Sequence, residues 1–383
     1  MAQQQYVTDS EPPAASVSPK SPPLPWPDRL RIVATVMVIA IHVTSPTVEQ
    51  FGAVEPGGWW AANWWNSLTR PAVPLFVMLS GYLLFAKDYP LGDFLRRRFS
   101  RVLIPAFFWM LVFSVYNYFA NGYPTNAIEL FRSLVSGPVY FHLWFIYMII
   151  GLYLVYPILR PWVRSASDRE FWYFFICCAV GTWLWKILYV FYQLPIGIGF
   201  ELFCNQCGYF VLGYYLGWKP LAGDGLANGD ARGDAQGASL LAPWAWSDVQ
   251  LRRIAWGLII GAGVVTAVGT WWASTTKGGG HYFPFFQDYL TPNVGLASIG
   301  WFLLARLSFG QPALRRWEGS FAAASFGIYF AHVIVLDWWK GYVLKSVPWS
   351  PIVFVPVYLV LTVVCTFGFV LLIRMLPGGK KIT

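Results

Sequence analysis

Charged side chains are scarce in this sequence. Only 12% of its 383 residues are Asp, Glu, Lys or Arg, while 57% are hydrophobic; a soluble domain is about one quarter charged. The charges form short clusters between long apolar runs, a pattern typical of loops between membrane-spanning helices. A soluble fold is therefore excluded, and the net charge of +9 reflects loop arginines and lysines rather than a nucleic-acid partner.

Cysteine is also rare, with five residues, all of them inside apolar stretches. This placement excludes a disulfide framework. Cys204 and Cys207 form one CxxC pair, but no second pair or nearby histidine completes a zinc site. We therefore interpret the cysteines as small packing residues and expect no metal site.

The composition divides the chain into segments. Residues 1–27 are rich in Pro, Ser and Gln, so we expect a disordered cytoplasmic tail. Residues 28–376 form the membrane domain. A Gly-, Ala- and Asp-rich stretch within 219–251 predicts a flexible cytoplasmic loop, and 377–383 a short cytoplasmic tail. No cleavable signal peptide is apparent, because the first apolar run, from Leu30, is long enough to span a membrane.

The apolar runs predict an all-α polytopic membrane protein of about ten transmembrane helices. We place the spans near 29–48, 66–86, 100–120, 141–161, 170–191, 199–218, 252–273, 289–308, 319–340 and 352–375. With both termini in the cytoplasm, 21 of the 27 Lys and Arg residues fall on the inner side. This split follows the positive-inside rule. The other six are Arg70, Arg132, Lys186, Lys277, Lys340 and Lys345.

The outer segments are aromatic, for example at 58–65 and 281–286. Tryptophan at a membrane interface anchors helices. Flat aromatic faces also suit sugar rings. Both interpretations remain open from the sequence.

Arg31 and His42 lie on the first predicted helix, eleven residues apart. At about 100° per residue they return to nearly the same helix face, separated by about 16 Å along the axis. A histidine inside a membrane helix is costly and usually faces a functional cavity, so His42 is a candidate general base. The structural alternative is a histidine that is hydrogen-bonded to a neighbouring helix.

Two other histidines are candidates for the same region. His332 lies about 12 Å from the outer end of its predicted span, and His42 about 9 Å from its own, so the two can share a cavity. There His332 would bind the acceptor or orient His42. His142 opens a span near the outer surface, where a structural and a functional role are equally compatible with the sequence.

A cluster of arginines precedes the third predicted span. It comprises Arg96, Arg97, Arg98 and Arg101. The positive-inside rule alone accounts for cations at this place. Guanidinium groups facing Arg31 would also bind phosphates, and the residues alone do not separate the two interpretations.

Five short motifs carry a resemblance to a known family. The first helix, DRLRIVATVMVIAIH, resembles that of membrane acyltransferase family 3, with an arginine, then a histidine, and Asp28 before them. PLFVMLSGYLLF at 74–85 is similar to the second-helix motif of that family. RRRFSRVLIP resembles the Arg-x-x-Arg motif of the family, HLWFIYMIIGLYLVYPIL resembles its fourth helix, and SFGIYFAH resembles its Tyr-x-x-His element.

The resemblance covers about 28–376 and is nearest to the branch that O-acetylates surface polysaccharides, close to the enterobacterial common antigen acetyltransferases. It implies an O-acyltransferase of the bacterial inner membrane that uses acyl-CoA, usually acetyl-CoA, and a lipid-linked or polymeric carbohydrate acceptor. Arg31, Arg98 and Arg101 would then bind the phosphates of the donor. His42, with Arg31 and His332, would be catalytic, and Tyr329, His142 and Trp144 would bind the acceptor.

Two mechanisms fit these residues. In direct transfer, His42 removes a proton from the sugar hydroxyl, which attacks the thioester. In the alternative, His42 carries the acyl group itself. A transporter or flippase of a glycan or small anionic solute, with intramembrane His and Arg along its path, is the competing functional class.

Overall fold

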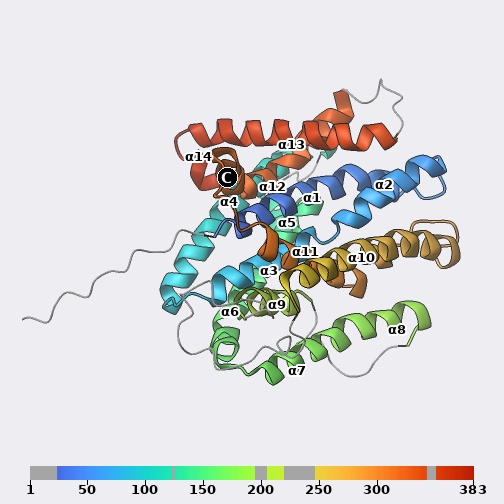
Figure 1. Ribbon diagram of the computed structural model, residues 1–383. Coiled ribbons are helices and arrows are strands. Elements are labelled where there is room, and N and C mark those ends of the chain that lie inside the picture. Colours follow the sequence, from blue (N-terminus) through green and yellow to red (C-terminus); the bar gives the residue numbers. More distant parts are fainter. Residues whose placement is uncertain (1–23, 123–125, 195–204, 220–245, 343–350) are drawn as a thin grey trace, which may run out of the picture.

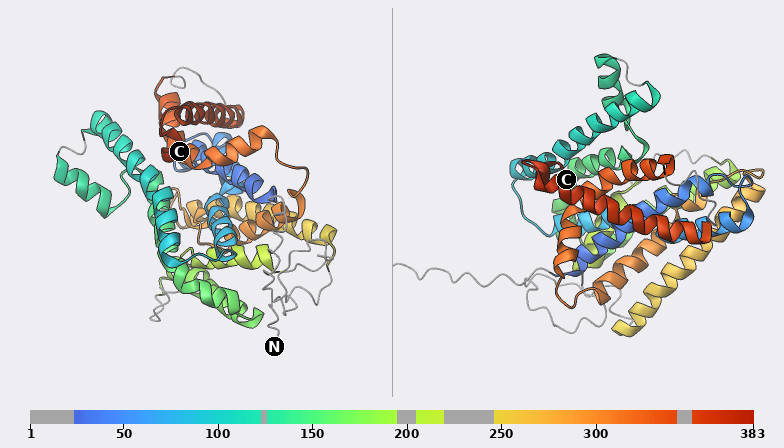
Figure 2. Two further views of the ribbon diagram at one scale, coloured as in Figure 1. Left: turned by 90° about the vertical axis from the view of Figure 1, so that its left-hand side faces the viewer. Right: turned by 90° about the horizontal axis from the view of Figure 1, so that it is seen from above.

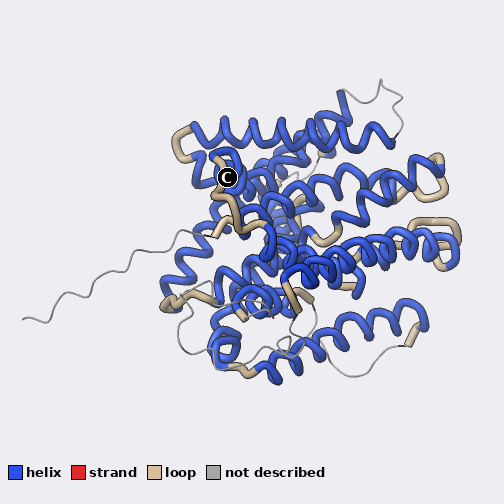
Figure 3. The backbone as a smooth tube through the Cα atoms, in the orientation of Figure 1, coloured by secondary structure: helices blue, strands red, loops and turns tan. Residues whose placement is uncertain are grey.

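The computed structural model describes residues 24–122, 126–194, 205–219, 246–342 and 351–383. Throughout these residues the regular structure is helical (Figures 1 and 3), as the sequence predicts. The first half contains α1 (Trp26–Val48), α2 (Pro56–Thr69), α3 (Ala72–Phe85), α4 (Leu91–Asn121), α5 (Ala127–Ser136), η1 (Phe141–Leu143), α6 (Trp144–Ser165), α7 (Asp168–Ala179), the π-helical turn η2 (Val180–Leu184) and α8 (Trp185–Tyr192). The second half contains α9 (Cys207–Trp218), α10 (Asp248–Thr276), η4 (Phe285–Gln287), α11 (Pro292–Ser308), α12 (Arg316–Tyr342), α13 (Pro351–Met375) and α14 (Gly379–Ile382).

Eight helical segments of the described chain are long and apolar enough to cross a membrane. This confirms the all-α polytopic class. The sixth and eighth predicted spans correspond to α9 and α11, which have 12 and 17 residues. At 1.5 Å per residue they extend about 18 and 25 Å, less than a hydrocarbon core of about 30 Å. The residues just before α9, 195–204, lie outside the described part.

The second span begins ten residues earlier than the sequence analysis predicts. Its segment Pro56–Phe85 has 30 residues and combines α2 with α3. Glu55 caps α2 by accepting hydrogen bonds from the backbone N–H groups of Gly57 and Gly58, and Pro56 follows it at the first helical position. The tryptophans of 58–65, predicted as an outer segment, therefore lie on a helix. Trp60 packs against Trp271 of α10 with ring centroids 6.0 Å apart.

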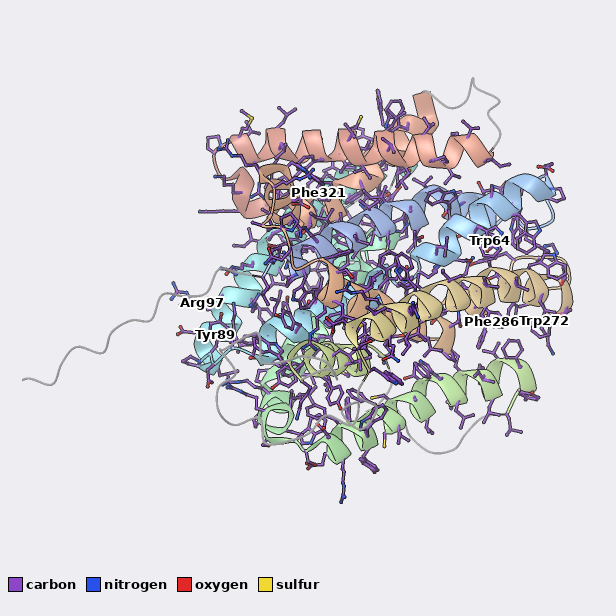
Figure 4. All side chains as sticks on the ribbon, in the orientation of Figure 1. Trp64, Tyr89, Arg97, Trp272, Phe286 and Phe321 are labelled. Carbon is purple, nitrogen blue, oxygen red and sulfur yellow. The ribbon has the colours of Figure 1, made fainter. Side chains whose placement is uncertain are left out.

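Helix α1 lies at the centre of the bundle and contacts α2, α3, α11, α12 and α13 (Figure 1). Most of its residues between Leu30 and Val48 are buried. In contrast, α4 runs away from the bundle and carries α5 outward (Figure 2). Arg97 and Tyr89 mark one end of the bundle, and Trp64, Trp272 and Phe286 lie towards the opposite end (Figure 4). We call the first the arginine end.

Glycines allow α3 and α9 to pack with their backbones in contact. A Cβ atom at Gly81 would lie 1.7 Å from the carbonyl oxygen of Phe210, and one at Gly213 would lie 1.9 Å from that of Met78. Small residues at such crossings permit the close approach on which membrane helix packing depends. The glycine of the LSGYLL motif therefore has a packing role that its sequence context does not reveal.

Two predicted segments fall mostly outside the described residues. These are the N-terminal tail, of which 24–27 are described, and the 219–251 loop. The segment predicted as a C-terminal tail contains α14, which contacts α4 and α13. The indole N–H of Trp109 donates to the carbonyl oxygen of Ile382 at 2.8 Å.

Candidate functional site

Three of the four histidines meet at the centre of the bundle, although they come from separate parts of the chain. His42 on α1 stacks on His332 of α12, with ring centroids 5.2 Å apart and planes inclined by 30°. His142 of η1 meets His332 edge-on at 5.5 Å. The sequence predicts similar depths for His42 and His332, and the structure brings the two rings into contact. His281, the fourth histidine, is exposed in the segment after α10.

The hydrogen bonds of His332 define its tautomer. Its Nδ1 lies 2.6 Å from the carbonyl oxygen of Tyr329 and 3.2 Å from that of Ile328. Carbonyl oxygens only accept hydrogen bonds, so Nδ1 carries the proton and Nε2 of the neutral ring has a lone pair. Among the described residues Nε2 has no hydrogen-bond partner, and the side chain is fully buried. His332 is thus oriented by its own helix and has one nitrogen available to accept a proton.

The η1 turn is fixed to α12 on both sides of the histidines. The hydroxyl of Tyr329 donates to the carbonyl oxygen of His142, and the hydroxyl of Tyr140 donates to Oδ2 of Asp337 at 2.7 Å. Burial, followed by the bond to Asp337, raises the pKa of Tyr140, so its hydroxyl stays protonated as a donor. These two bonds hold Phe141 against His42, with ring centroids 5.1 Å apart.

A small cavity lies beside His42. It has a volume of about 20 Å³, enough for about one water molecule. Its lining includes His42, His142, Trp144, Tyr289 and Tyr329, together with apolar side chains of α1, α3 and α6. Trp144 and Tyr289 stack at its wall with centroids 5.6 Å apart. The structure thus gathers the three predicted acceptor-binding residues around His42; their roles remain predictions.

The predicted donor-binding arginines lie at the other end of α1. Arg31 is half-buried and forms an ion pair with Asp28 one turn earlier. Arg98 is half-buried and Arg101 exposed, both near the start of α4. The guanidinium groups of Arg31, Arg98 and Arg101 all act electrostatically on the buried hydroxyl of Tyr153 on α6. All three cations therefore act on one buried group of α6, although Arg101, like Arg96 and Arg97, is exposed.

Helix α1 connects the two groups without a break. It runs continuously from Trp26 to Val48, so the eleven residues between Arg31 and His42 correspond to about 16 Å of helix. One end presents cations suited to phosphates and the other an imidazole cluster beside an aromatic wall. Cys207 of the CxxC pair is partly buried on α9, and Cys204 lies outside the described residues.

Sequence reasoning missed Tyr289, Phe141 and Asp337. Tyr289 lies between η4 and α11 and reaches the cavity only through the tertiary fold. Asp337 is five residues after His332, and its position on α12 does not reveal that Tyr140 and Tyr116 donate to it. Its acidic side chain inside a predicted span was nevertheless a usable signal.

Tyr329→Phe is expected to lower the turnover of this site about tenfold with little change in folding. The substitution removes the bond that positions η1 over the histidines, and a buried neutral hydrogen bond contributes about 1 kcal/mol. Tyr358→Phe is the matched control, because Tyr358 donates to the carbonyl oxygen of Leu336 at 2.8 Å, away from the cavity. Equal loss of turnover in both variants, measured with their thermal stabilities, would contradict a role for Tyr329 at the site.

Comparison with protein families shows that a family model described as an acyltransferase domain matches residues 24–371. The match includes α1, η1, α12 and the start of α4, and thus every residue of the two groups. Comparison with curated proteins and with solved structures found no significant match.

Proposed function

The chain belongs to acyltransferase family 3, and from this membership we propose that it is an O-acyltransferase acting on a carbohydrate. The proposed donor is acyl-CoA, with acetyl-CoA first among the candidates. The acceptor is a hydroxyl group of a lipid-linked oligosaccharide or a surface polysaccharide. The proposed location is the bacterial cytoplasmic membrane, with the arginine end and both termini facing the cytoplasm.

The observation that carries the proposal is the polarity of α1. Arg31 near its start acts electrostatically, with Arg98 and Arg101 of α4, on the hydroxyl of Tyr153, and its other half places His42 beside an aromatic cavity. Coenzyme A carries a pyrophosphate and a 3′-phosphate, which guanidinium groups bind through charge-assisted hydrogen bonds. Its long pantetheine arm would carry the thioester from these cations towards His42. Family membership and this arrangement favour an acyltransferase over a transporter.

In the proposed reaction His42 acts as general base. It accepts the proton of the sugar hydroxyl while the hydroxyl oxygen attacks the thioester carbonyl carbon. Collapse of the tetrahedral intermediate breaks the C–S bond and releases CoA thiolate towards the arginine end. Acyl sugar and CoA are the products, and the proton leaves His42 for the solvent. His332, stacked on His42, would orient its ring.

The aromatic wall supports a carbohydrate acceptor. Trp144 and Tyr289 present stacked rings beside His42 and His142, and flat apolar rings suit the C–H faces of sugars. Tyr329 and His142 are the proposed polar contacts of the acceptor. The polar groups would then select the hydroxyl that is presented to His42.

The proposal is tested with purified protein in lipid nanodiscs, given acetyl-CoA with a labelled acetyl group and glycans extracted from the source membrane. We expect label to move into a glycan fraction and free CoA to appear in equal amount. A failure to release CoA with every extract, combined with protein-dependent movement of solute across vesicles, would instead support the transporter class.

A further inference from the structure

Arg70 is a charged residue in the middle of a membrane span. It lies at the junction of α2 and α3, fifteenth of the 30 residues of the segment Pro56–Phe85. Placing a guanidinium at this depth is costly, and ionisable residues inside membrane helices usually serve a substrate path or a binding site. None of the roles proposed above uses Arg70.

The partners of Arg70 orient its guanidinium without neutralising it. Nε donates to Oδ1 of Asn66 at 2.7 Å, and Nη2 donates to Oε1 of Gln287 at 2.8 Å. Both acceptors are neutral amides, and both residues are fully buried or nearly so. The guanidinium also lies 5.9 Å from the ring centroid of Tyr289, and the hydroxyl of Tyr282 donates to the same Oε1 of Gln287 at 2.8 Å.

No carboxylate forms an ion pair with Arg70 among the described residues. The acidic group nearest in sequence to its partners, Asp288, pairs instead with Lys186 at 2.6 Å. Glu49 acts electrostatically on Tyr282 but makes no ion pair with Arg70. By contrast, Arg29 at the arginine end is matched by Glu318 at 3.1 Å. Among the described residues, the positive charge of Arg70 is thus balanced by no carboxylate in an ion pair.

Arg70 lies at about the same depth as His42. One residue, Tyr289, is close to Arg70 and also lines the cavity beside His42. Asn66 donates to Oγ1 of Thr44, two residues after His42, at 2.9 Å. Because α2 runs antiparallel to α1, Arg70 is one turn, about 6 Å, closer to the arginine end than Asn66. Tyr289, beneath the guanidinium, lines the cavity. Tyr289 therefore belongs both to the wall of the cavity and to the surroundings of Arg70.

We propose that Arg70 is an anion-binding subsite for the acceptor, which holds a carboxylate or phosphate group while a hydroxyl lies beside His42. The proposal rests on the proposed function and adds the acceptor class: an acidic glycan or a glycan on a lipid phosphate. Guanidinium binds both oxyanions through paired N–H groups. Asn66 and Gln287 hold the side chain in place before the ligand arrives, which lowers the entropic cost of binding.

Four probes test this subsite without any acyl donor. Methyl glucuronide is compared with methyl glucoside, and farnesyl phosphate with farnesol, so that each anionic probe has a neutral counterpart. The readout is the thermal midpoint of the purified protein in detergent, which rises with ligand occupancy. The variants are Arg70→Gln, Arg70→Lys and, as the control for removal of a cation on the same side, Lys277→Gln; Lys277 is exposed beyond α10.

We expect at least one anionic probe to raise the midpoint of the wild type and of Lys277→Gln about 2 °C more than its neutral counterpart. Arg70→Gln should abolish this difference and Arg70→Lys should reduce it, because lysine keeps the charge but not the paired donors. A response to glucuronide identifies a sugar carboxylate, and a response to farnesyl phosphate a lipid phosphate.

Equal shifts with charged and neutral probes in the wild type, or a difference that persists in Arg70→Gln, would overturn the proposal. If Arg70→Gln does not fold, Arg70→Lys decides: an undiminished difference there also overturns it. Because no acyl donor is present, a chain that proves inactive in the transfer assay can still pass this test, and an active chain can fail it.

Discussion

His42→Ala is expected to lower acyl transfer by about three orders of magnitude while the protein remains folded in the membrane. A positioned general base contributes about 10²- to 10⁴-fold to a proton-transfer step. Direct transfer and an acyl-histidine intermediate both require the imidazole, so the loss is expected under either mechanism. Turnover of labelled acetyl-CoA into glycan, measured on equal amounts of folded protein, gives the effect.

His281→Ala is the control for this experiment. The residue is exposed in the segment after α10, so its removal should leave turnover unchanged. His42 is half-buried between His332 and Phe141, and its truncation leaves a gap that lowers stability. Normal turnover in His42→Ala would remove the residue from the mechanism. If His281→Ala lost as much turnover as His42→Ala, the effect of either substitution would be non-specific.

Replacing Arg98 or Arg101 by Gln should weaken acyl-CoA binding about 10- to 100-fold. A hydrogen bond to a charged group contributes about 1.5–3 kcal/mol, and each 1.4 kcal/mol changes a dissociation constant tenfold. The effect should fall on the dissociation constant of acyl-CoA and leave the KM for the acceptor nearly unchanged. Equilibrium binding of radiolabelled acetyl-CoA to the purified variants provides the measurement.

Arg97→Gln separates binding from membrane topology. Arg97 lies on the same helix as Arg98 and also belongs to the arginine end, but it is exposed (Figure 4). It contributes equally to the positive-inside bias. If all three substitutions weaken binding alike, the cluster acts through general charge; if none does, Arg98 and Arg101 serve topology alone.

Much of the candidate site can be predicted from the sequence because one helix, α1, carries a residue of each part of the site, Arg31 and His42. The regular rise of a helix fixes the spacing of Arg31 and His42 before any tertiary structure is known. All spans cross the same bilayer, so the distance of a residue from the outer end of its span gives its depth. By this measure His332 and His42 lie at similar depths, which allows them to meet. Both steps use only helix geometry and the bilayer, so they hold in the folded chain.

The remaining features depend on packing that one sequence does not specify. The wall formed by Trp144 and Tyr289 joins α6 to the segment before α11. The buried network that orients Arg70 joins Asn66 to Gln287, more than two hundred residues later. Likewise, the apolar composition of 199–218 and 289–308 predicts two spans, of which the described residues form α9 with 12 residues and α11 with 17. In the fold, α9 packs against α3 and α11 against α10.

The most direct test of the central claim is mass spectrometry of surface glycans from cells with the wild-type chain, with His42→Ala and without the protein. We predict an acyl group, 42 Da if acetyl, on one class of glycan in wild-type cells, and its absence from the other two. Identical glycan masses in all three would contradict the assignment of this chain as a glycan O-acyltransferase with His42 at its centre.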